Sequence, residues 1–194
     1  MGAMVAMRRS KIETAATRRC IVASASSALR TRGIEAVSLG AVMAEVGLTH
    51  GGFYRHFPSR EALVAEALDD AVDTALDTLA AEANRHPGRE FSALVRLYLS
   101  SSHRDEPSAG CPFAALGSDL ARAPQATRTA ATAGLQRFIT TIAATLAEPL
   151  KPRAPAIASL LVGALTVARV TDDAAQSQAI LAEALHAAEH LGQP

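Results

Sequence analysis

The sequence predicts an all-α protein of about nine helices. Hydrophobic residues make up 49% of the chain and aromatic residues only 4%, and Ala dominates the hydrophobic fraction. A composition rich in Ala and Leu, with few β-branched runs, favours helices that pack closely together. Apolar residues recur at helical spacing along the chain and nowhere sustain the alternation of a strand. The 194 residues suffice for a small domain joined to a medium one.

The first helices are marked by apolar stripes and by residues that start or end a helix. One stripe ends at Gly33, which suits the residue after a helix because it tolerates positive φ. A second follows Ser38, a suitable N-cap, and a third short helix follows Thr49. Ser59 can cap a long fourth helix. The stripes comprise Ile21, Ala25, Ala28 and Leu29, then Leu39, Val42, Met43 and Val46, then Val64, Leu68, Val72, Ala75, Leu76 and Leu79.

The second half continues the helical pattern between Pro and Gly breaks. His86-Pro87-Gly88 is a break, and residues 104–110 form a predicted loop. Pro149, Pro152 and Pro155 punctuate a later connection. The sequence predicts helices near 91–98, 111–121, 124–146, 156–170 and 174–191.

Charge is unevenly distributed along a chain whose net charge is zero. Residues 1–60 hold nine Lys and Arg against three acidic residues, a charge of +6, so the remainder carries −6. The nine are Arg8, Arg9, Lys11, Arg18, Arg19, Arg30, Arg32, Arg55 and Arg60. Such asymmetry suggests an N-terminal part that binds a polyanion.

Residues 38–60 predict a helix-turn-helix. A helix of about eight residues, a turn at Gly47 and a second short helix follow one another, and the second helix of this motif enters the major groove. Phe53 and Phe57 are assigned to the core. The residues expected at the DNA are Ser38, Thr49, His50, Gly51, Gly52, Tyr54, Arg55, His56 and Arg60. The glycines allow close approach, the others offer hydrogen-bond donors, and two helix N-termini suit phosphates.

The segment Gly47-Leu-Thr-His-Gly-Gly-Phe-Tyr-Arg-His-Phe-Pro-Ser-Arg-Glu-Ala-Leu63 resembles the signature of the tetracycline-repressor (TetR) family of bacterial regulators. The similarity spans roughly residues 18–68. Thr49 replaces the common Ser, Arg60 the common Lys, and Met43-Ala-Glu stands where Ile-Ala is usual. The resemblance implies that His50 and Gly51 face base edges, and that Tyr54, His56 and Arg60 contact phosphates. Alternatively, Tyr54 and His56 are only cap and core residues.

The predicted organisation is a three-helix DNA-binding domain, residues 11–58, followed by an effector-binding and dimerisation domain, residues 59–194. The helix from Ser59 is the expected connector. The last two helices are apolar on several sides, and the family resemblance implies a homodimer through them. The expected interface residues are Leu161, Ala164, Leu165, Leu181 and Leu185. Burial of both helices within one chain is the alternative.

A pocket for a small-molecule effector is expected among the later helices. Its predicted lining is Tyr98, His103, Arg104, Cys111, Phe113 and Phe138. Because the chain has only five Phe and two Tyr, we expect a mostly aliphatic ligand. Cys111, near a helix N-terminus, could instead have a lowered pKa and sense oxidants. A plain buried Cys is the other possibility.

Other function classes find little support in the sequence. His103 and Cys111 alone do not make a metal site, and neither a cofactor motif nor a catalytic constellation is present, so no metal, cofactor or enzymatic activity is expected. Two Cys make no disulfide framework, and no secretory signal or bilayer-spanning segment is recognised. The sequence predicts a cytoplasmic, ligand-responsive repressor that binds a palindromic double-stranded DNA operator. A helical enzyme with a vestigial DNA-binding domain and a helical interaction module are the alternatives.

Overall fold

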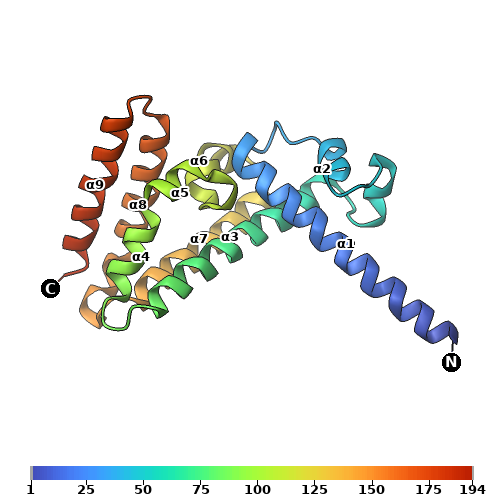
Figure 1. Cartoon of the computed structure of the whole chain (residues 1–194), viewed down its shortest axis with the longest axis horizontal. Coiled ribbons are helices and arrows are strands. Elements are labelled where there is room, and N and C mark those ends of the chain that lie inside the picture. The colour runs from blue at the N-terminus through green and yellow to red at the C-terminus, as the bar shows by residue number, and fades with distance from the viewer. Residues whose placement is uncertain (1, 194) are drawn as a thin grey trace.

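The computed structural model describes the backbone of residues 2–193 and the side chains of residues 13–193. Within this part of the chain all regular structure is helical, and the predicted all-α fold is confirmed (Figure 1). The elements are α1 (Gly2–Arg32), α2 (Leu39–Glu45), η1 (His50–Arg55), α3 (Arg60–Asn84), α4 (Glu90–Tyr98), α5 (Ser101–Asp105), η2 (Pro107–Ala109), α6 (Pro112–Arg122), α7 (Gln125–Ala144), η3 (Glu148–Arg153), α8 (Ala154–Val170) and α9 (Ala174–Leu191).

Two segments differ from the sequence prediction. The third helix, η1, is a 3₁₀-helix, and its N-cap Thr49 makes no side-chain hydrogen bond. Two adjacent glycines in a six-residue helix disfavour regular α-helix, which explains the tighter form. Residues 104–110, predicted as a loop, include the end of α5 and all of η2. Ser100 stabilises α5 by accepting a hydrogen bond from the His103 backbone N–H at 3.2 Å.

Helix α3 connects the two ends of the molecule. It begins beside α2 and η1 and continues alongside α7 toward the end where α8 and α9 pair (Figure 1). Ser59 caps it by accepting from the Ala62 backbone N–H at 3.2 Å, as the sequence predicts. One continuous helix therefore follows η1, packs against α1 and then packs against α4 and α7 along its length.

Backbone hydrogen bonds fix the loop between α1 and α2 to the rest of the chain. The Ile34 N–H donates to the Asp119 carboxylate on α6 at 3.1 Å. The Ile34 carbonyl accepts from the Arg60 guanidinium at 2.5 Å, and the Val37 carbonyl accepts from the same guanidinium at 3.3 Å. We call this arrangement the Ile34 clamp. It joins the helix-turn-helix to both α3 and α6.

The most apolar segment, Glu148–Val170, is long and apolar enough to cross a bilayer by length and composition alone. It consists of the Pro-containing η3 and the 17-residue α8. Ile157, Leu161 and Leu165 of α8 are fully buried, and the helix packs against α9, α7 and α6. These contacts are those of a core helix of the bundle.

The turn at Gly47 gives a test of backbone conformation. Its φ is +73°, and a Cβ there would meet no atom within 4 Å, so only backbone strain opposes a side chain. We expect Gly47→Ala to lower the free energy of unfolding by about 1–2 kcal/mol. Gly51→Ala is the matched control, because Gly51 has ordinary φ and equally open space. It should change stability by less than about 0.5 kcal/mol. Denaturant titration of both variants measures this, and equal stabilities would contradict the role assigned to Gly47.

Candidate DNA-binding surface and internal cavity

The helix-turn-helix is held by a small apolar core and one cap. The Ser38 hydroxyl accepts from the Ala41 backbone N–H at 3.1 Å, which starts α2. Phe53 and Phe57 are buried and stack with ring centroids 5.6 Å apart, so their assignment to the core is confirmed. With these rings inside, the remaining side chains of η1 face outward.

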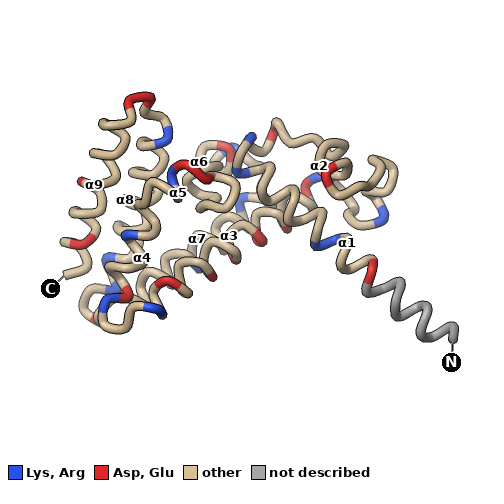
Figure 2. Tube along the Cα trace, in the orientation of Figure 1, with Lys and Arg blue, Asp and Glu red and all other residues tan. Residues whose placement is uncertain are grey.

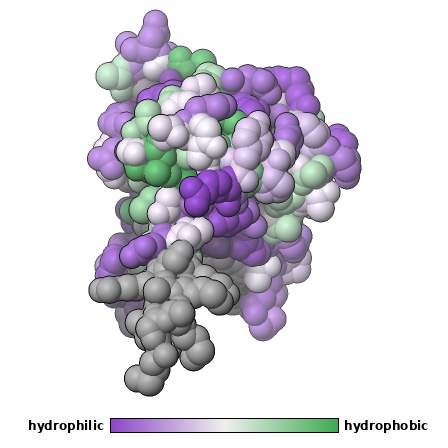
Figure 3. Space-filling model, turned by 90° about the vertical axis from the view of Figure 1, so that its right-hand side faces the viewer, coloured by the Kyte–Doolittle hydropathy of each residue, from purple (hydrophilic) through white to green (hydrophobic). Residues whose placement is uncertain are grey.

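The outward face of η1 carries the predicted DNA-contacting residues. The Tyr54 side chain is 66% exposed and packs edge-on against the Phe53 ring. Thr49, His50, Gly51 and Arg55 are exposed, as is Ser38 of the neighbouring cap, while Gly52 is half-buried. Within the chain nothing comes within 4 Å of a Cβ built on Gly51. This end of the molecule presents a largely hydrophilic surface (Figure 3).

His56 and Arg60 are more enclosed than the other predicted contact residues. His56 is half-buried, and its Nδ1 is buried without a partner among the described residues. Its backbone carbonyl accepts from Arg18 Nε at 3.3 Å, and the Arg18 guanidinium lies 4.4 Å from the Phe57 ring centroid and pairs with Glu66. The Arg60 guanidinium is engaged in the Ile34 clamp. DNA contacts by His56 and Arg60 stay predictions, and both residues also serve the local structure.

Acidic residues gather on α3, whereas Lys and Arg occur at both ends of the molecule (Figure 2). Seven acidic residues follow one another along α3, and Arg137 of α7 pairs with two of them, Asp69 and Asp73 (Figure 2). Arg55 lies at the exposed end of η1. The side chains of Arg8, Arg9 and Lys11 lie outside the described residues.

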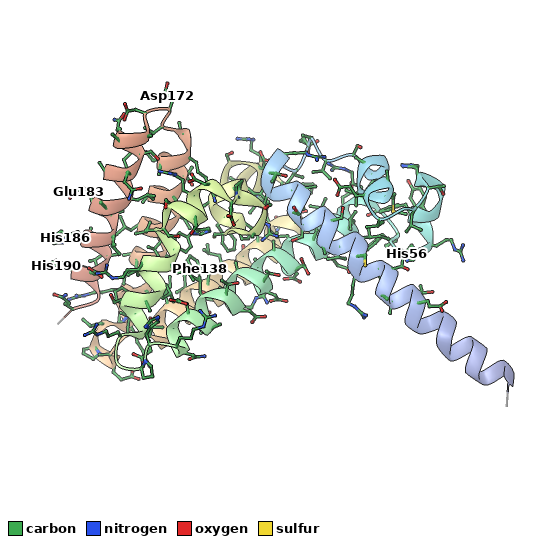
Figure 4. The ribbon with its side chains drawn as sticks, in the orientation of Figure 1. His56, Phe138, Asp172, Glu183, His186 and His190 are labelled. Carbon is green, nitrogen blue, oxygen red and sulfur yellow. The ribbon has the colours of Figure 1, made fainter. Side chains whose placement is uncertain are left out.

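A cavity of about 150 Å³ lies between α3, α4 and the segment from α5 to α6. Five of the six predicted ligand-binding residues line it, namely Tyr98, His103, Cys111, Phe113 and Phe138. Phe138 comes from α7 in the middle of the bundle (Figure 4). Arg104 does not line the cavity. Its guanidinium pairs with Asp105 and donates to Ser177 Oγ at 3.2 Å, which ties α5 to α9.

One wall of the cavity is aromatic. The rings of Tyr98 and Phe138 stack with centroids 5.6 Å apart, and those of Phe138 and Phe113 follow at 6.3 Å. The lining is apolar but holds more aromatic residues than the sequence predicts, and the mostly aliphatic ligand stays a prediction. Few aromatic residues exist in the chain, but three of the seven gather here. Val72, Leu76 and Leu79 of α3 and Leu97 of α4 are the larger aliphatic residues of the lining.

His103 and Cys111 share a hydrogen bond at the cavity rim. His103 Nδ1 contacts the Tyr98 carbonyl oxygen at 2.6 Å, and Nε2 accepts from the Cys111 backbone N–H at 2.9 Å. This pattern needs a neutral ring with its proton on Nδ1, and burial lowers the pKa of His103 accordingly. Burial raises the pKa of the Cys111 thiol. The lowered thiol pKa considered from the sequence is thus not found.

Burial on α8 and α9 shows that some residues predicted for the dimer interface lie in the core instead. Leu161, Leu165 and Leu181 are buried inside the chain, with at most 1% of each residue exposed, so they belong to the intrachain core. Ala164 and Leu185 are half-buried. A shallow apolar groove instead lies along the outer side of the pair, lined by Ser159, Leu160, Gly163, Ala164, Val167, Ile180, Glu183, Ala184 and Ala187. Glu183, His186 and His190 lie along α9 at the outer edge of the molecule (Figure 4).

One buried arginine, Arg30, and one half-buried arginine, Arg169, were missed from the sequence. Arg30 of α1 donates to the Gly110 carbonyl at 3.1 Å, beside the cavity, and to Ser26. Arg169 of α8 donates to the carbonyls of His103 and Arg104. The signal for Arg30 was present: Ser26 and Arg30 are polar residues at i and i+4 on an otherwise apolar helix face. No such pattern marks Arg169.

Comparisons with known proteins agree with this geometry. Residues 21–67 match the family described as "Bacterial regulatory proteins, tetR family". No curated protein matches the chain by sequence. The fold is similar to that of reduced NemR from Escherichia coli, with 19% identity, a TM-score of 0.74 and coverage of 90% of this chain and 95% of that one.

A TetR transcriptional regulator from Chloroflexus aurantiacus shares 22% identity over 93% of this chain and 96% of its own, with a TM-score of 0.74. SCO4454, a TetR-family regulator from Streptomyces coelicolor, shares 22% identity over 90% and 93%, with a TM-score of 0.73. The matched residues 21–67 contain the whole helix-turn-helix, from the buried stripe of α1 to the start of α3. Residues 21–67 therefore match the DNA-binding domain of the TetR family, and the chain as a whole has the fold of these transcriptional regulators.

Proposed function

We propose that this protein is a ligand-responsive repressor that acts in the cytoplasm as a homodimer on a palindromic DNA operator. The observation that carries the proposal is the combination of an exposed η1 face with a separate internal cavity, connected by one helix, α3. Residues 11–58 would form the DNA-binding domain and residues 59–194 the effector-binding and dimerisation domain. The protein would act by binding and not by catalysis.

Recognition would rest on η1 in the major groove. The exposed His50 and the open side of Gly51 suit contact with base edges, while Thr49, Tyr54 and Arg55 suit phosphates. A two-fold dimer would place two such helices in half-sites about one helical turn apart, on the order of 34–36 Å. Arg18 and Arg60 would support η1 from behind through their contacts with His56 and with the Ile34 clamp.

DNA binding can be tested by fluorescence anisotropy over a salt series, on an operator selected from random sequences. We expect affinity to fall steeply with salt. Tyr54→Ala should weaken binding to all sequences by about 1 kcal/mol, roughly fivefold, because a phosphate contact is lost. Gly51→Ala should weaken it without loss of stability, because the new methyl group meets the DNA. Arg128→Ala, an exposed arginine on α7, is the control and should bind as the unaltered protein does. Salt-independent binding would contradict the proposal.

Dimerisation would use the shallow groove of α8 and α9. Leu160, Gly163, Ala164 and Val167 recur at i, i+3, i+4 and i+7 on α8, and Val167 is 52% exposed. Small residues allow close approach of a second helix pair, and an exposed apolar face of this kind favours association.

A charge in the groove should separate the two subunits. We expect Val167→Glu to give a monomer with greatly reduced operator affinity, because the carboxylate would be buried at the interface without a partner. Ala182→Glu is the control, since residue 182 is exposed on α9 but does not line the groove. Light scattering distinguishes the states. A monomeric unaltered protein at micromolar concentration would refute the dimer.

The effector would act by preferring one of two dimer conformations. A ligand that binds both equally shifts nothing. The Gly110 carbonyl, in the cavity wall, accepts a hydrogen bond from Arg30 of α1. The Asp119 carboxylate of α6 accepts one from the Ile34 N–H, in the loop that follows α1. Movement of this wall on ligand binding would therefore reach the helix-turn-helix by two hydrogen bonds as well as through α3.

The rival switch, oxidation of Cys111, is disfavoured by the raised thiol pKa and by burial, because the thiolate is the reactive form. The exposed Cys20 supplies the matched control. With a thiol-specific colorimetric reagent at neutral pH, Cys111→Ser should keep the fast reaction of Cys20, and Cys20→Ser should leave only a slow one. The slow rate should rise with pH as thiolate forms. Fast modification of Cys111 at neutral pH, with release of DNA, would favour the thiol switch.

A further inference from the structure

The cavity contains a buried donor that lacks a nitrogen or oxygen acceptor. Tyr98 is fully buried and lines the cavity, and its hydroxyl makes no hydrogen bond to a nitrogen or oxygen atom of the described residues, the Cys111 thiol being its polar neighbour. A buried, unpaired hydroxyl costs free energy comparable to a lost hydrogen bond. The Cys111 thiol is the neighbouring side chain with the largest electrostatic effect on the pKa of Tyr98, and a thiol is only a weak hydrogen-bond acceptor. A ligand oxygen would satisfy the Tyr98 hydroxyl.

Two guanidinium groups lie behind the cavity wall at Gly110, although neither Arg30 nor Arg169 lines the cavity itself. Arg30 donates to the Gly110 carbonyl, and Arg169 Nη2 would lie 3.1 Å from a Cβ built on Gly110. Neither arginine forms an ion pair with a described carboxylate, and Nη1 of Arg169 is buried without a partner. Asp70 and Asp105 act on the pKa values of Arg30 and Arg169, respectively, by electrostatic attraction without forming an ion pair. Glu106, an exposed residue, also lines the cavity. Two partly desolvated positive charges at this end favour an anion.

The size and lining of the rest of the cavity suit a small aromatic ring. Its volume of about 150 Å³ is near that of an apolar cavity that holds benzene. Phe113, Phe138 and Tyr98 form one wall and Leu76 and Leu79 contribute the other, so a single planar ring would contact aromatic and aliphatic groups together.

We propose that the effector is a small aromatic carboxylate, with its ring in the apolar part of the cavity and its carboxylate accepting from the Tyr98 hydroxyl at the end near Gly110. This inference rests on the proposed effector function and specifies the chemistry of that site. His103 cannot supply the positive charge, because both of its ring nitrogens are engaged with the backbone in the neutral form.

Calorimetric titration of the full-length protein with four single-ring probes tests the ligand class. Benzoate should bind most tightly, benzamide more weakly because it keeps the acceptor but lacks the charge, and toluene more weakly again. Benzylamine should bind least, because it brings a positive charge toward Arg30 and Arg169. Toluene or benzylamine binding as tightly as benzoate, or no binding by benzoate, would overturn the proposal.

The hydroxyl is tested by Tyr98→Phe, which keeps the stacked ring. We expect benzoate affinity to fall about tenfold or more, since a hydrogen bond to a charged acceptor is lost, and toluene affinity to stay unchanged. Tyr54→Phe, at the other Tyr of the chain, should leave benzoate binding unaffected. Thermal unfolding by circular dichroism checks that Tyr98→Phe is folded. A folded Tyr98→Phe that binds benzoate as the unaltered protein does would refute the contact.

DNA-binding measurements keep the two proposals apart. Benzoate that binds but leaves the operator complex intact supports the ligand class and contradicts regulation through the cavity. Benzoate that neither binds nor releases DNA, while operator binding is normal, overturns the ligand class and leaves DNA recognition standing.

Discussion

The continuity of α3 is the constraint on which the rest of the structure depends. A helix of 25 residues is about 37 Å long and cannot bend sharply without Pro or another break, and α3 contains none. Its first turns are buried against α1, and Leu76 and Leu79, four turns later, line the cavity. The helix-turn-helix and the cavity are therefore connected by one continuous, rigid helix. A tilt of α3 at one end would displace the residues at its other end.

The fold was predictable to the extent that it depends on local patterns. Apolar spacing, the caps at Ser38 and Ser59, and the positive-φ glycines Gly33 and Gly47 mark the helices and turns correctly. The failures arise where tertiary packing decides. η1 is a 3₁₀-helix, and α5 forms where Pro and Gly suggested only a loop, because Ser100 caps it.

The site residues illustrate the same limit. Periodicity identified Leu161, Leu165 and Leu181 as apolar, but it could not tell which side of α8 and α9 faces the chain's own core. Counting aromatic residues predicted few of them in the cavity, yet composition says nothing of where Tyr98, Phe113 and Phe138 meet. Arg169 reaches the cavity wall from a distant helix, 66 residues beyond the His103 carbonyl that it contacts, which no local pattern could indicate.

The Ile34 clamp has a consequence for how this sequence can vary. Asp119 and Arg60 bind the main chain of residue 34, and every residue except proline offers the same N–H and carbonyl. The side chain at position 34 can therefore be exchanged for another apolar one of similar size without loss of this connection, whereas positions 60 and 119 must retain a donor and an acceptor. Among descendants of this sequence, this connection should be preserved at positions 60 and 119, while position 34 should vary among apolar residues of similar size.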